Sequence, residues 1–446
     1  MRVPVLAILP SQEPLQESAA TALDPNLPPS SLANAEVPSG LDLDMSFAAV
    51  PIGSGTGQEA SLESLEPTQS ERFAVRAFVD VDDPADIPEE VDGQPLFGDP
   101  AIAHFLTCGG TPPMGATVDV ATKLNTAALS SRGLDGSEVA VAIADTGINL
   151  NHLKAQLGQM PLLDAGNSWR PPGGPAPGTS PVDHGTMCAY DALITAPRAT
   201  LLDVPVLRAT APGGAVTGGF LSVALQAFAH LLGFWAVAFA PGGGPRYKAL
   251  VINNSWGIFH PSWDFPPGHP GRYIDNPTHP FTALTSVLAR SGADILFAAG
   301  NCGTQCADGR CQGRTTGTIC GANASPDVLT LAGCDTNDVR VGYSSRGPSI
   351  AGMFQNKPDI TAYTHFLGSK AFGPTAPDSG TSAACPVAAG CVAAIRTKVS
   401  PTTVPPANLF AQLQSTARPV AGQVGWNRDY GHGIIDPDSA AQSLGV

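Results

Sequence analysis

The sequence predicts an α/β protein built on a mostly parallel sheet. Two unbroken apolar runs of strand length, at residues 139–144 and 295–299, are typical of strands buried on both faces of such a sheet. Residues 383–395 are small and apolar and predict a buried helix, with Pro386 in its first turn, where proline is tolerated. Each of these elements adjoins a polar residue that can carry chemistry.

An acid, an imidazole and a hydroxyl follow one another along the chain. Asp145 ends the first strand at its carboxyl edge, His184 stands in an Asp-His-Gly-Thr segment, and Ser382 precedes the small-residue helix. A serine hydroxyl barely ionises at neutral pH, so a base must take its proton as it attacks. Histidine suits that task, and a buried aspartate would hold its tautomer. Read singly, the three segments are also consistent with a strand end, a helix start and a helix cap.

A fourth segment strengthens this interpretation. The run at 295–299 continues into Gly300 and Asn301. A side-chain amide there can donate to the oxyanion of a tetrahedral intermediate, a contact typically worth about 3–4 kcal/mol. The alternative is that Asn301 caps a turn. The other three segments, in this order, favour the oxyanion role.

Taken together, the segments resemble the subtilases, the subtilisin-like serine peptidases, from about residue 136 to the C-terminus. The resemblance extends to residues 251–257, 343–348, 357–360 and 430–436. It implies a subtilisin-like three-layer fold, with helices flanking a mostly parallel central sheet, and a peptide or protein as substrate. The implied catalytic residues are Asp145, His184 and Ser382, with Asn301 and the Ser382 N–H at the oxyanion. The implied substrate-binding residues are Ser255, Trp256, Gly257, Ala298, Ala299 and Gly300.

The sequence therefore predicts a serine endopeptidase that acts through an acyl-enzyme. Two other functions stay open: a peptide-maturation protease or transpeptidase dedicated to one substrate, and a non-catalytic peptide-binding module. The residues after Asp145 lack the Pro-Asp often found in the family, whose aspartate is a calcium ligand in many relatives. We accordingly assign no metal, and we expect no cofactor.

Net charge and hydropathy limit the classes of partner that the chain can bind. The formal net charge is −15, with a sequence pI near 4.9, which argues against nucleic acid and anionic membranes. Residues 221–240 carry no charge and are long enough to span a bilayer. Gln226, His230 and the position between two core strands favour a buried crossover helix instead. The sequence leaves the oligomeric state open.

The first part of the chain differs in composition. We expect residues 1–110 to form a Pro/Gly-rich, acidic and partly disordered extension, and residues 111–446 to form the peptidase domain. Within the extension, residues 73–81 predict a strand, and residues 70–95 are either propeptide-like or a variable linker with one edge strand. The apolar run at 3–10 is short and split by prolines, so it is a poor secretory signal. A cytoplasmic location is favoured over secretion.

Two segments beside the expected site leave alternatives open. Four cysteines, Cys302, Cys306, Cys311 and Cys320, follow Asn301 with spacing that fits a disulfide-pinned loop, free thiols or a zinc site. Residues 258–280 form an aromatic and proline-rich insertion. It either shapes substrate specificity or is a surface loop packed by its own aromatic side chains.

Overall fold

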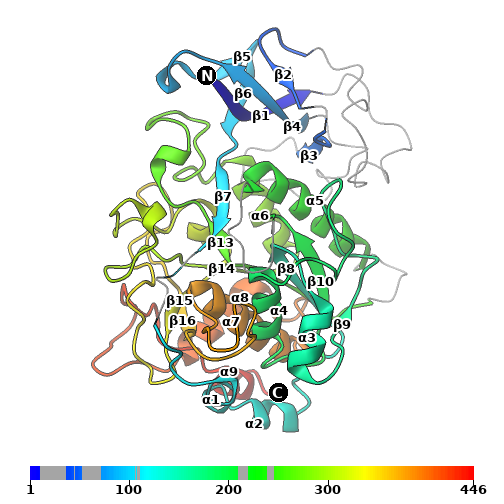
Figure 1. The fold of residues 1–446 in the computed structure, drawn as a ribbon, viewed down its shortest axis with the longest axis vertical. Coiled ribbons are helices and arrows are strands. Elements are labelled where there is room, and N and C mark those ends of the chain that lie inside the picture. Colours follow the sequence, from blue (N-terminus) through cyan, green and yellow to red (C-terminus); the bar gives the residue numbers. More distant parts are fainter. Residues whose placement is uncertain are drawn as a thin grey trace.

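The computed structural model describes residues 1–10, 37–44, 46–52, 72–105, 107, 111–208, 219–238 and 246–446. Figure 1 shows two parts, a mainly antiparallel sheet of N-terminal residues at the top and a larger α/β body below it. One strand, β7, runs from the upper part down into the body. The C-terminus lies at the opposite end of the molecule from the N-terminal sheet.

The body is built on a seven-stranded sheet whose strand pairs are all parallel. Its order is β16-β15-β14-β12-β8-β10-β9. The bounds are β8 (Val139–Asp145), β9 (Leu162–Leu163), β10 (Thr200–Pro205), β12 (Ala249–Asn254), β14 (Asp294–Ala298), β15 (Leu329–Cys334) and β16 (Ile360–Tyr363). Both apolar runs singled out in the sequence are central strands, β8 and β14. This confirms the predicted mostly parallel sheet.

Helices cover both faces of this sheet and make the fold three-layered (Figure 1). The side chains of Val139, Val141 and Ile143 join a core with α4 (His184–Ala192) and α7 (Thr381–Arg396). The alternate alanines of β8 face the other core, with α5 (Leu221–Ala238) and α6 (Pro280–Arg290). The remaining helices are α1 (Thr117–Lys123), α2 (Thr126–Ser131), α3 (Leu150–Leu157), α8 (Pro406–Thr416) and α9 (Pro437–Ser443).

The uncharged stretch at 221–240 contains α5, and the side chains along one side of this helix are buried between the sheet and α6. Within the described residues, no helix has both the length and the apolar character that a bilayer crossing requires. Of the polar residues of α5, Ser222 is buried and donates to the carboxylate of Asp99, whereas Gln226 and His230 are only partly buried. Gln226 donates to the carbonyl of Ala48, and a ring nitrogen of His230 lies 3.0 Å from the carbonyl of Asn167.

The N-terminal sheet corrects one expectation. The predicted strand at 73–81 is present as β4 (Arg72–Asp80), but residues 2–10 also form a strand, β1 (Arg2–Pro10), for which the sequence had suggested no structure. β1 pairs with β4 along its whole length, and its apolar side chains are buried on both faces. The other strands are β2 (Asp42–Leu43), β3 (Val50–Ile52), β5 (Glu90–Val91) and β6 (Gln94–Gly98). The two segments of the extension that are richest in Pro, Ser and Gly, at 25–31 and 53–57, lie outside the described residues.

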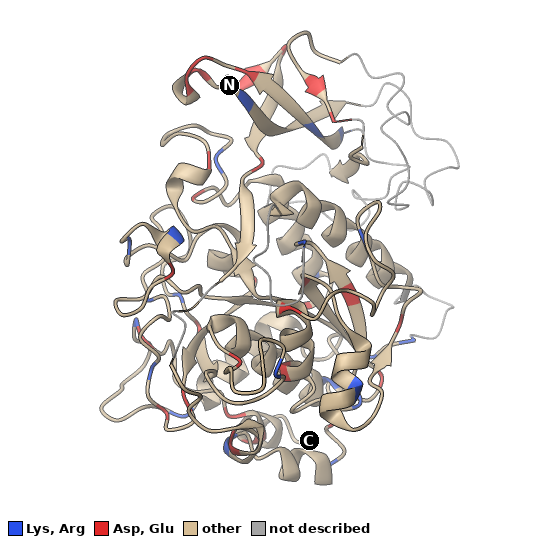
Figure 2. Cartoon of the chain, in the orientation of Figure 1, with Lys and Arg blue, Asp and Glu red and all other residues tan. Residues whose placement is uncertain are grey.

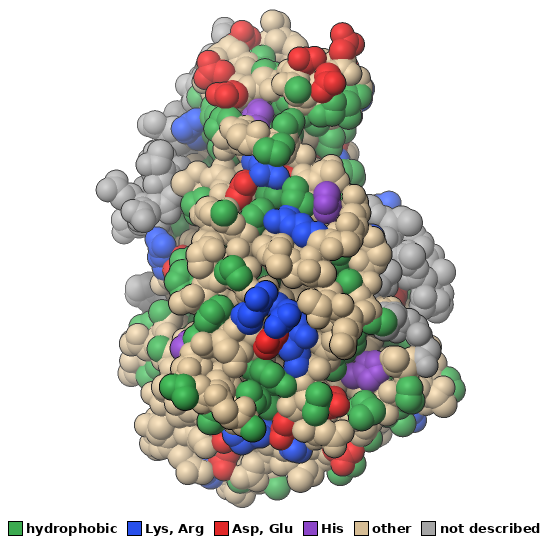
Figure 3. Space-filling model, turned by 90° about the vertical axis from the view of Figure 1, so that its left-hand side faces the viewer, with side chains coloured by type: hydrophobic (Ala, Val, Ile, Leu, Met, Phe, Trp, Pro, Cys, Tyr) green, Lys and Arg blue, Asp and Glu red, His purple; other side chains and the backbone are tan. Residues whose placement is uncertain are grey.

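Charge is distributed unevenly between the two parts. Figure 2 shows acidic residues in the turns of the N-terminal sheet, where Asp82, Asp83, Asp86, Glu89 and Glu90 are all exposed. In the space-filling view the tip of that sheet carries acidic side chains, whereas Lys and Arg side chains lie on the body below it (Figure 3). The central helices carry few charges, and α7 has Arg396 alone.

A third, small sheet joins the two parts. The strand β7 (Ala101–His104) lies between β11 (Gly219–Phe220) and β13 (Trp256–Gly257) and is antiparallel to both. In this arrangement Ala101 pairs with Phe220 and His104 pairs with Trp256. Residues of the N-terminal extension therefore form the middle strand of a sheet whose two edges belong to the body.

Candidate active site

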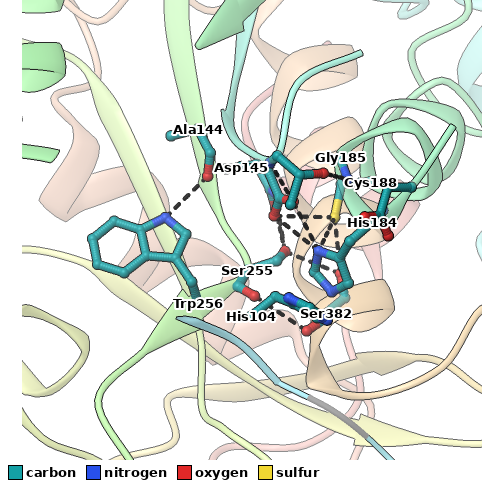
Figure 4. A network of polar contacts seen from close by, with 12 residues as sticks. His104, Ala144, Asp145, His184, Gly185, Cys188, Ser255, Trp256 and Ser382 are labelled. Atoms are coloured by element: carbon teal, nitrogen blue, oxygen red, sulfur yellow. Dashed lines mark hydrogen bonds and ion pairs between the residues drawn. The ribbon is translucent and has the colours of Figure 1, made fainter. Parts of the chain in front are cut away.

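Asp145 and His184 meet at the carboxyl edge of the central sheet (Figure 4). Nδ1 of His184 lies 2.8 Å from Oδ1 and 3.0 Å from Oδ2 of Asp145, and both side chains are buried. The backbone N–H of Thr146 donates to Oδ1 of Asp145 at 2.8 Å and fixes the carboxylate. Because a carboxylate only accepts, Nδ1 carries the ring proton and Nε2 carries the lone pair.

His184 is the first residue of α4, and the helix start holds it in place. Oδ1 of Asp183 accepts the backbone N–H of His184 at 2.8 Å, as an N-cap does. Burial raises the pKa of Asp183 to about 6, against the opposing effect of this hydrogen bond. The hydroxyl of Thr146 accepts the N–H of Gly185 at 2.8 Å, which ties the helix start to the end of β8.

Ser382 lies beside this pair, near the start of α7 (Figure 4). Its Oγ donates to the carbonyl of Ser255 at 3.2 Å, and Oγ of Ser255 in turn donates to the carbonyl of Ser382 at 3.0 Å. Nε2 of His184 is buried and has no hydrogen-bond partner among the described residues. The structure thus joins Asp145 to His184, whereas the Ser382 hydroxyl is turned to Ser255.

Asn301 packs against the same helix start. Its Oδ1 accepts the N–H of Thr381 at 2.9 Å and the hydroxyl of Thr381 at 3.1 Å, so the amide orientation is fixed. Gly380 has a φ of +82°, and a Cβ at that position would come within 2.8 Å of Nδ2 of Asn301. Only glycine leaves the room that this amide needs.

The end of strand β7 lies against His184. The ring of His104 lies on the ring of His184, with centroids 4.4 Å apart. Beyond the strand, Oγ1 of Thr107 lies 3.0 Å from Oγ of Ser379. The chain segment between these two contacts contains Phe105 and residue 106, and the latter is outside the described residues.

Phe105 is buried in an aromatic pocket. Its ring packs edge-to-face on Phe259 at a centroid distance of 5.0 Å. Two glycines leave space for the ring, because a Cβ at Gly257 would meet Cζ of Phe105 at 2.8 Å and one at Gly300 would meet Cε1 at 3.1 Å. The amide of Asn323 fixes the walls by donating to the carbonyls of Trp256 and Ala298, at 3.0 and 2.9 Å.

The insertion at 258–280 contacts both parts of the molecule. Phe259 belongs to the pocket around Phe105, whereas Phe265 packs in the core of the N-terminal sheet.

The sequence analysis had not singled out His104 or Phe105 as functional residues. The only local signal was the short, mostly apolar run at residues 101–105, which is typical of an ordinary short strand.

A cavity of about 680 Å³ opens beside His184, on the side of the chain that follows Phe105. Thr107 and Ser379 lie in its wall, together with the apolar side chains of Met187, Phe372 and Pro374. Phe105 and Thr107, in the segment that follows β7, both line this space.

Among the described residues, the carboxyl, imidazole and thiol of Asp145, His184 and Cys188 are close enough together to share a metal ion, within 4.8 Å. Nδ1 of His184 is committed to the Asp145 carboxylate, and burial together with Asp145 raises the pKa of the Cys188 thiol well above its usual value. A protonated thiol is a poor ligand.

The structure also bears on the cysteine cluster after Asn301. Cys302 and Cys311 form a disulfide, and Cys320 is a buried free thiol.

Comparison with known proteins agrees with this geometry. The family model described as the subtilase family matches residues 136–433. The human membrane-bound transcription factor site-1 protease is 31% identical over 172 residues, which are 37% of this chain and 15% of that protein. The chain thus spans only a small share of that relative's length. The family match covers every strand of the seven-stranded sheet and includes Asp145, His184 and Ser382, and the chain belongs to the subtilase family of serine peptidases.

Proposed function

We propose that this protein is a serine endopeptidase that uses Ser382 as nucleophile, His184 as base and Asp145 as the group that orients His184. The observation that carries the proposal is the extended segment at 101–105, which lies between two strand edges and against His184. Addition of an extended strand to exposed edges is a recurrent mode of peptide recognition. The segment therefore represents how a substrate chain binds.

The first half of the reaction uses the lone pair on Nε2 of His184. The Ser382 hydroxyl exchanges its bond to Ser255 for one to Nε2 by a change of rotamer. Its oxygen then attacks the carbonyl carbon of the substrate while its proton passes to Nε2. The Asp145 carboxylate stabilises the imidazolium that results.

The oxyanion of the tetrahedral intermediate receives hydrogen bonds from the Asn301 side-chain amide and the Ser382 N–H. His184 then gives its proton to the leaving amine, the C–N bond breaks, and an acyl-enzyme remains on Ser382. Water attacks the acyl-enzyme with His184 again as base, which releases the acid product and restores the serine. The orientation of Asn301 by Thr381 supports this role.

Residues 1–105 act in this proposal as an inhibitory N-terminal part that is removed by self-cleavage. Phe105 fills the primary specificity pocket, His104 takes the preceding subsite, and the bond between Phe105 and Leu106 is cleaved. The boundary moves from the expected residue 110 to residue 105 because the pocket glycines surround Phe105. An aromatic residue is then preferred before the cleaved bond, and the cavity beside Thr107 accepts apolar residues after it.

The test compares the wild type with Ser382→Ala by intact mass and by digestion of an unfolded protein. The wild type is expected to give fragments 1–105 and 106–446 and to digest the substrate, whereas the variant stays full-length and inactive. Ser415→Ala is the matched control, because Ser415 is exposed on α8 and bonds only within its own helix turn. A variant that still cleaves, or a wild type that never does, contradicts the proposal.

Product masses and active-site labelling address the two alternatives. Hydrolysis adds one water across the cleaved bond, whereas a transpeptidase joins the acyl part to an added amine. A fluorophosphonate that labels wild-type Ser382 but not the Ser382→Ala chain excludes a pure binding module.

A further inference from the structure

Arg310 contacts the backbone of the extended segment at 101–105, which lies against His184. Its Nη2 donates to the carbonyl of His104 at 2.7 Å. This carbonyl belongs to the residue before Phe105, so a substrate that follows the same path presents an equivalent carbonyl there. A guanidinium donates charge-assisted hydrogen bonds in a fixed geometry, which suits it to hold a backbone oxygen whatever the side chain.

The loop around Arg310 holds the guanidinium in that position. Asp308, itself buried, accepts from Nε of Arg310 at 3.0 Å and from Nη2 at 2.7 Å. The N–H of Asp308 donates to the carbonyl of Asn301 at 2.9 Å, and the Cys302–Cys311 disulfide closes the loop. The loop therefore starts at the expected oxyanion donor and is tied back to it.

Arg310 also covers the aromatic pocket. Its guanidinium carbon lies 3.9 Å from the centroid of the Phe259 ring, in a cation–π contact, and Phe259 packs on Phe105. One side chain thus contacts both the backbone before the cleaved bond and the wall of the pocket that receives Phe105.

We propose that Arg310 is a substrate-positioning residue that binds the backbone carbonyl of the residue two positions before the cleaved bond, and that the disulfide loop serves to hold it there. This inference rests on the proposed peptidase function. A purely structural role would require Arg310 only for folding, whereas the proposed role requires its hydrogen bond to one particular oxygen atom of the substrate.

The experiment removes that oxygen as an acceptor. The probe is a 4-nitroanilide with the sequence of residues 100–105, Pro-Ala-Ile-Ala-His-Phe, and its analogue with a thioamide in place of the His carbonyl. Each enzyme, expressed as the full chain, is assayed on both substrates. The kcat/KM ratio within one preparation is independent of how much of it is folded. The wild type is expected to prefer the oxygen substrate by about 10- to 100-fold.

In Arg310→Met the preference for the oxygen substrate is expected to fall nearly to the difference that the two substrates would show without the Arg310 contact. Arg310→Lys is expected to restore part of the preference. Arg314→Met is the matched control, because Arg314 bonds to the carbonyl of Thr316 in its own loop, and it keeps the wild-type ratio. Equal ratios in the wild type and Arg310→Met overturn the inference.

A second measurement separates this inference from the proposed function. In the Ser382→Ala background, hydrogen exchange of the β7 amides reports how firmly the segment is held without any turnover. Adding Arg310→Met is expected to speed that exchange several-fold, and adding Arg314→Met is not. A wild type that cleaves nothing contradicts the peptidase proposal, whereas unchanged exchange contradicts the role of Arg310.

Discussion

The imidazole of His104 lies on the imidazole of His184, with the ring centroids 4.4 Å apart and the planes tilted by 43°. His104 is 3% exposed, and burial, His184 and Arg310 together hold the pKa of His104 well below its usual value. A neutral ring can therefore lie against His184, where a fixed positive charge would be both desolvated and repelled.

This contact predicts the effect of a charge at residue 104. His104→Lys is expected to slow self-cleavage after Phe105 at least tenfold, because the ammonium must be buried beside His184. His104→Asn is the neutral control and should process close to the wild-type rate. The measurement is the fraction of full-length chain over time by intact mass, and equal rates for both variants contradict the prediction.

Loss of the Asn301 amide is expected to lower kcat rather than raise KM. In the proposed mechanism Asn301→Ala removes a donor to the developing oxyanion and not to the ground-state substrate, so kcat should fall by about 10²- to 10³-fold. Steady-state kinetics on the peptide anilide with the sequence of residues 100–105 give both constants. A drop confined to KM would show that Asn301 serves binding instead.

The glycines around Phe105 predict how specificity can be changed. In Gly257→Val the new side chain occupies the space of the Phe105 ring, since even a Cβ lies 2.8 Å from Cζ. The variant is expected to lose most cleavage after Phe while retaining cleavage after Ala. The measurement is the ratio of kcat/KM for two peptides that differ only in having Phe or Ala before the cleaved bond. An unchanged ratio would show that Gly257 does not line the pocket for that residue.

Two buried carboxyl groups predict a pH dependence of stability. Asp191 faces Asp378, and burial first and the Asp378 charge second raise the pKa of Asp191 well above its usual value. Burial raises the pKa of Asp378 to about 6. The folded chain therefore keeps protons that the unfolded chain releases near pH 4, so this stabilisation is complete below about pH 4 and is lost as the pH rises through 6.

Thermal unfolding of the Ser382→Ala chain between pH 5 and 8 tests this dependence without self-digestion. Its Tm is expected to fall across that range, and Asp191→Asn should flatten the fall because an amide has no proton to lose. Parallel Tm curves for the two chains would contradict the assignment.

Arg396 and Asp294 form a fully buried, bidentate ion pair that ties α7 to β14, with Nε and Nη2 at 2.6 and 2.7 Å from the carboxylate. Arg396→Met leaves the carboxylate buried and unpaired, which should cost about 3–5 kcal/mol of unfolding free energy. Arg290→Met breaks the exposed pair with Asp327 and should cost at most about 1 kcal/mol. Denaturant unfolding of both variants measures the difference.

The features that the sequence predicted are those with a local signature. An apolar run that ends in Asp145, and a small-residue helix that begins at Ser382, identify a parallel strand and a helix start without any tertiary information. Parallel strands align their carboxyl ends, so the meeting of these segments follows from the fold class. The predicted sheet, its helical layers and the family are confirmed.

The features that the sequence did not predict depend on contacts between distant residues. The strand nature of residues 2–10 depends on pairing with β4, some seventy residues later. Phe105 gains its place from glycines at 257 and 300, and Arg310 reaches a carbonyl 206 residues away in sequence. No periodicity marks such a contact, because each partner alone resembles an ordinary surface or core residue.

The slot that β7 fills has the width of a single strand, because β11 and β13 pair with it on either side. An extended backbone fits such a slot at roughly 3.3 Å per residue, whereas a helix about 10 Å wide cannot enter it. If substrates bind as proposed, a native protein would therefore be cut only where several consecutive residues detach from their own fold. Its cleavage sites would rank by the local free energy of opening rather than by how many aromatic residues it contains.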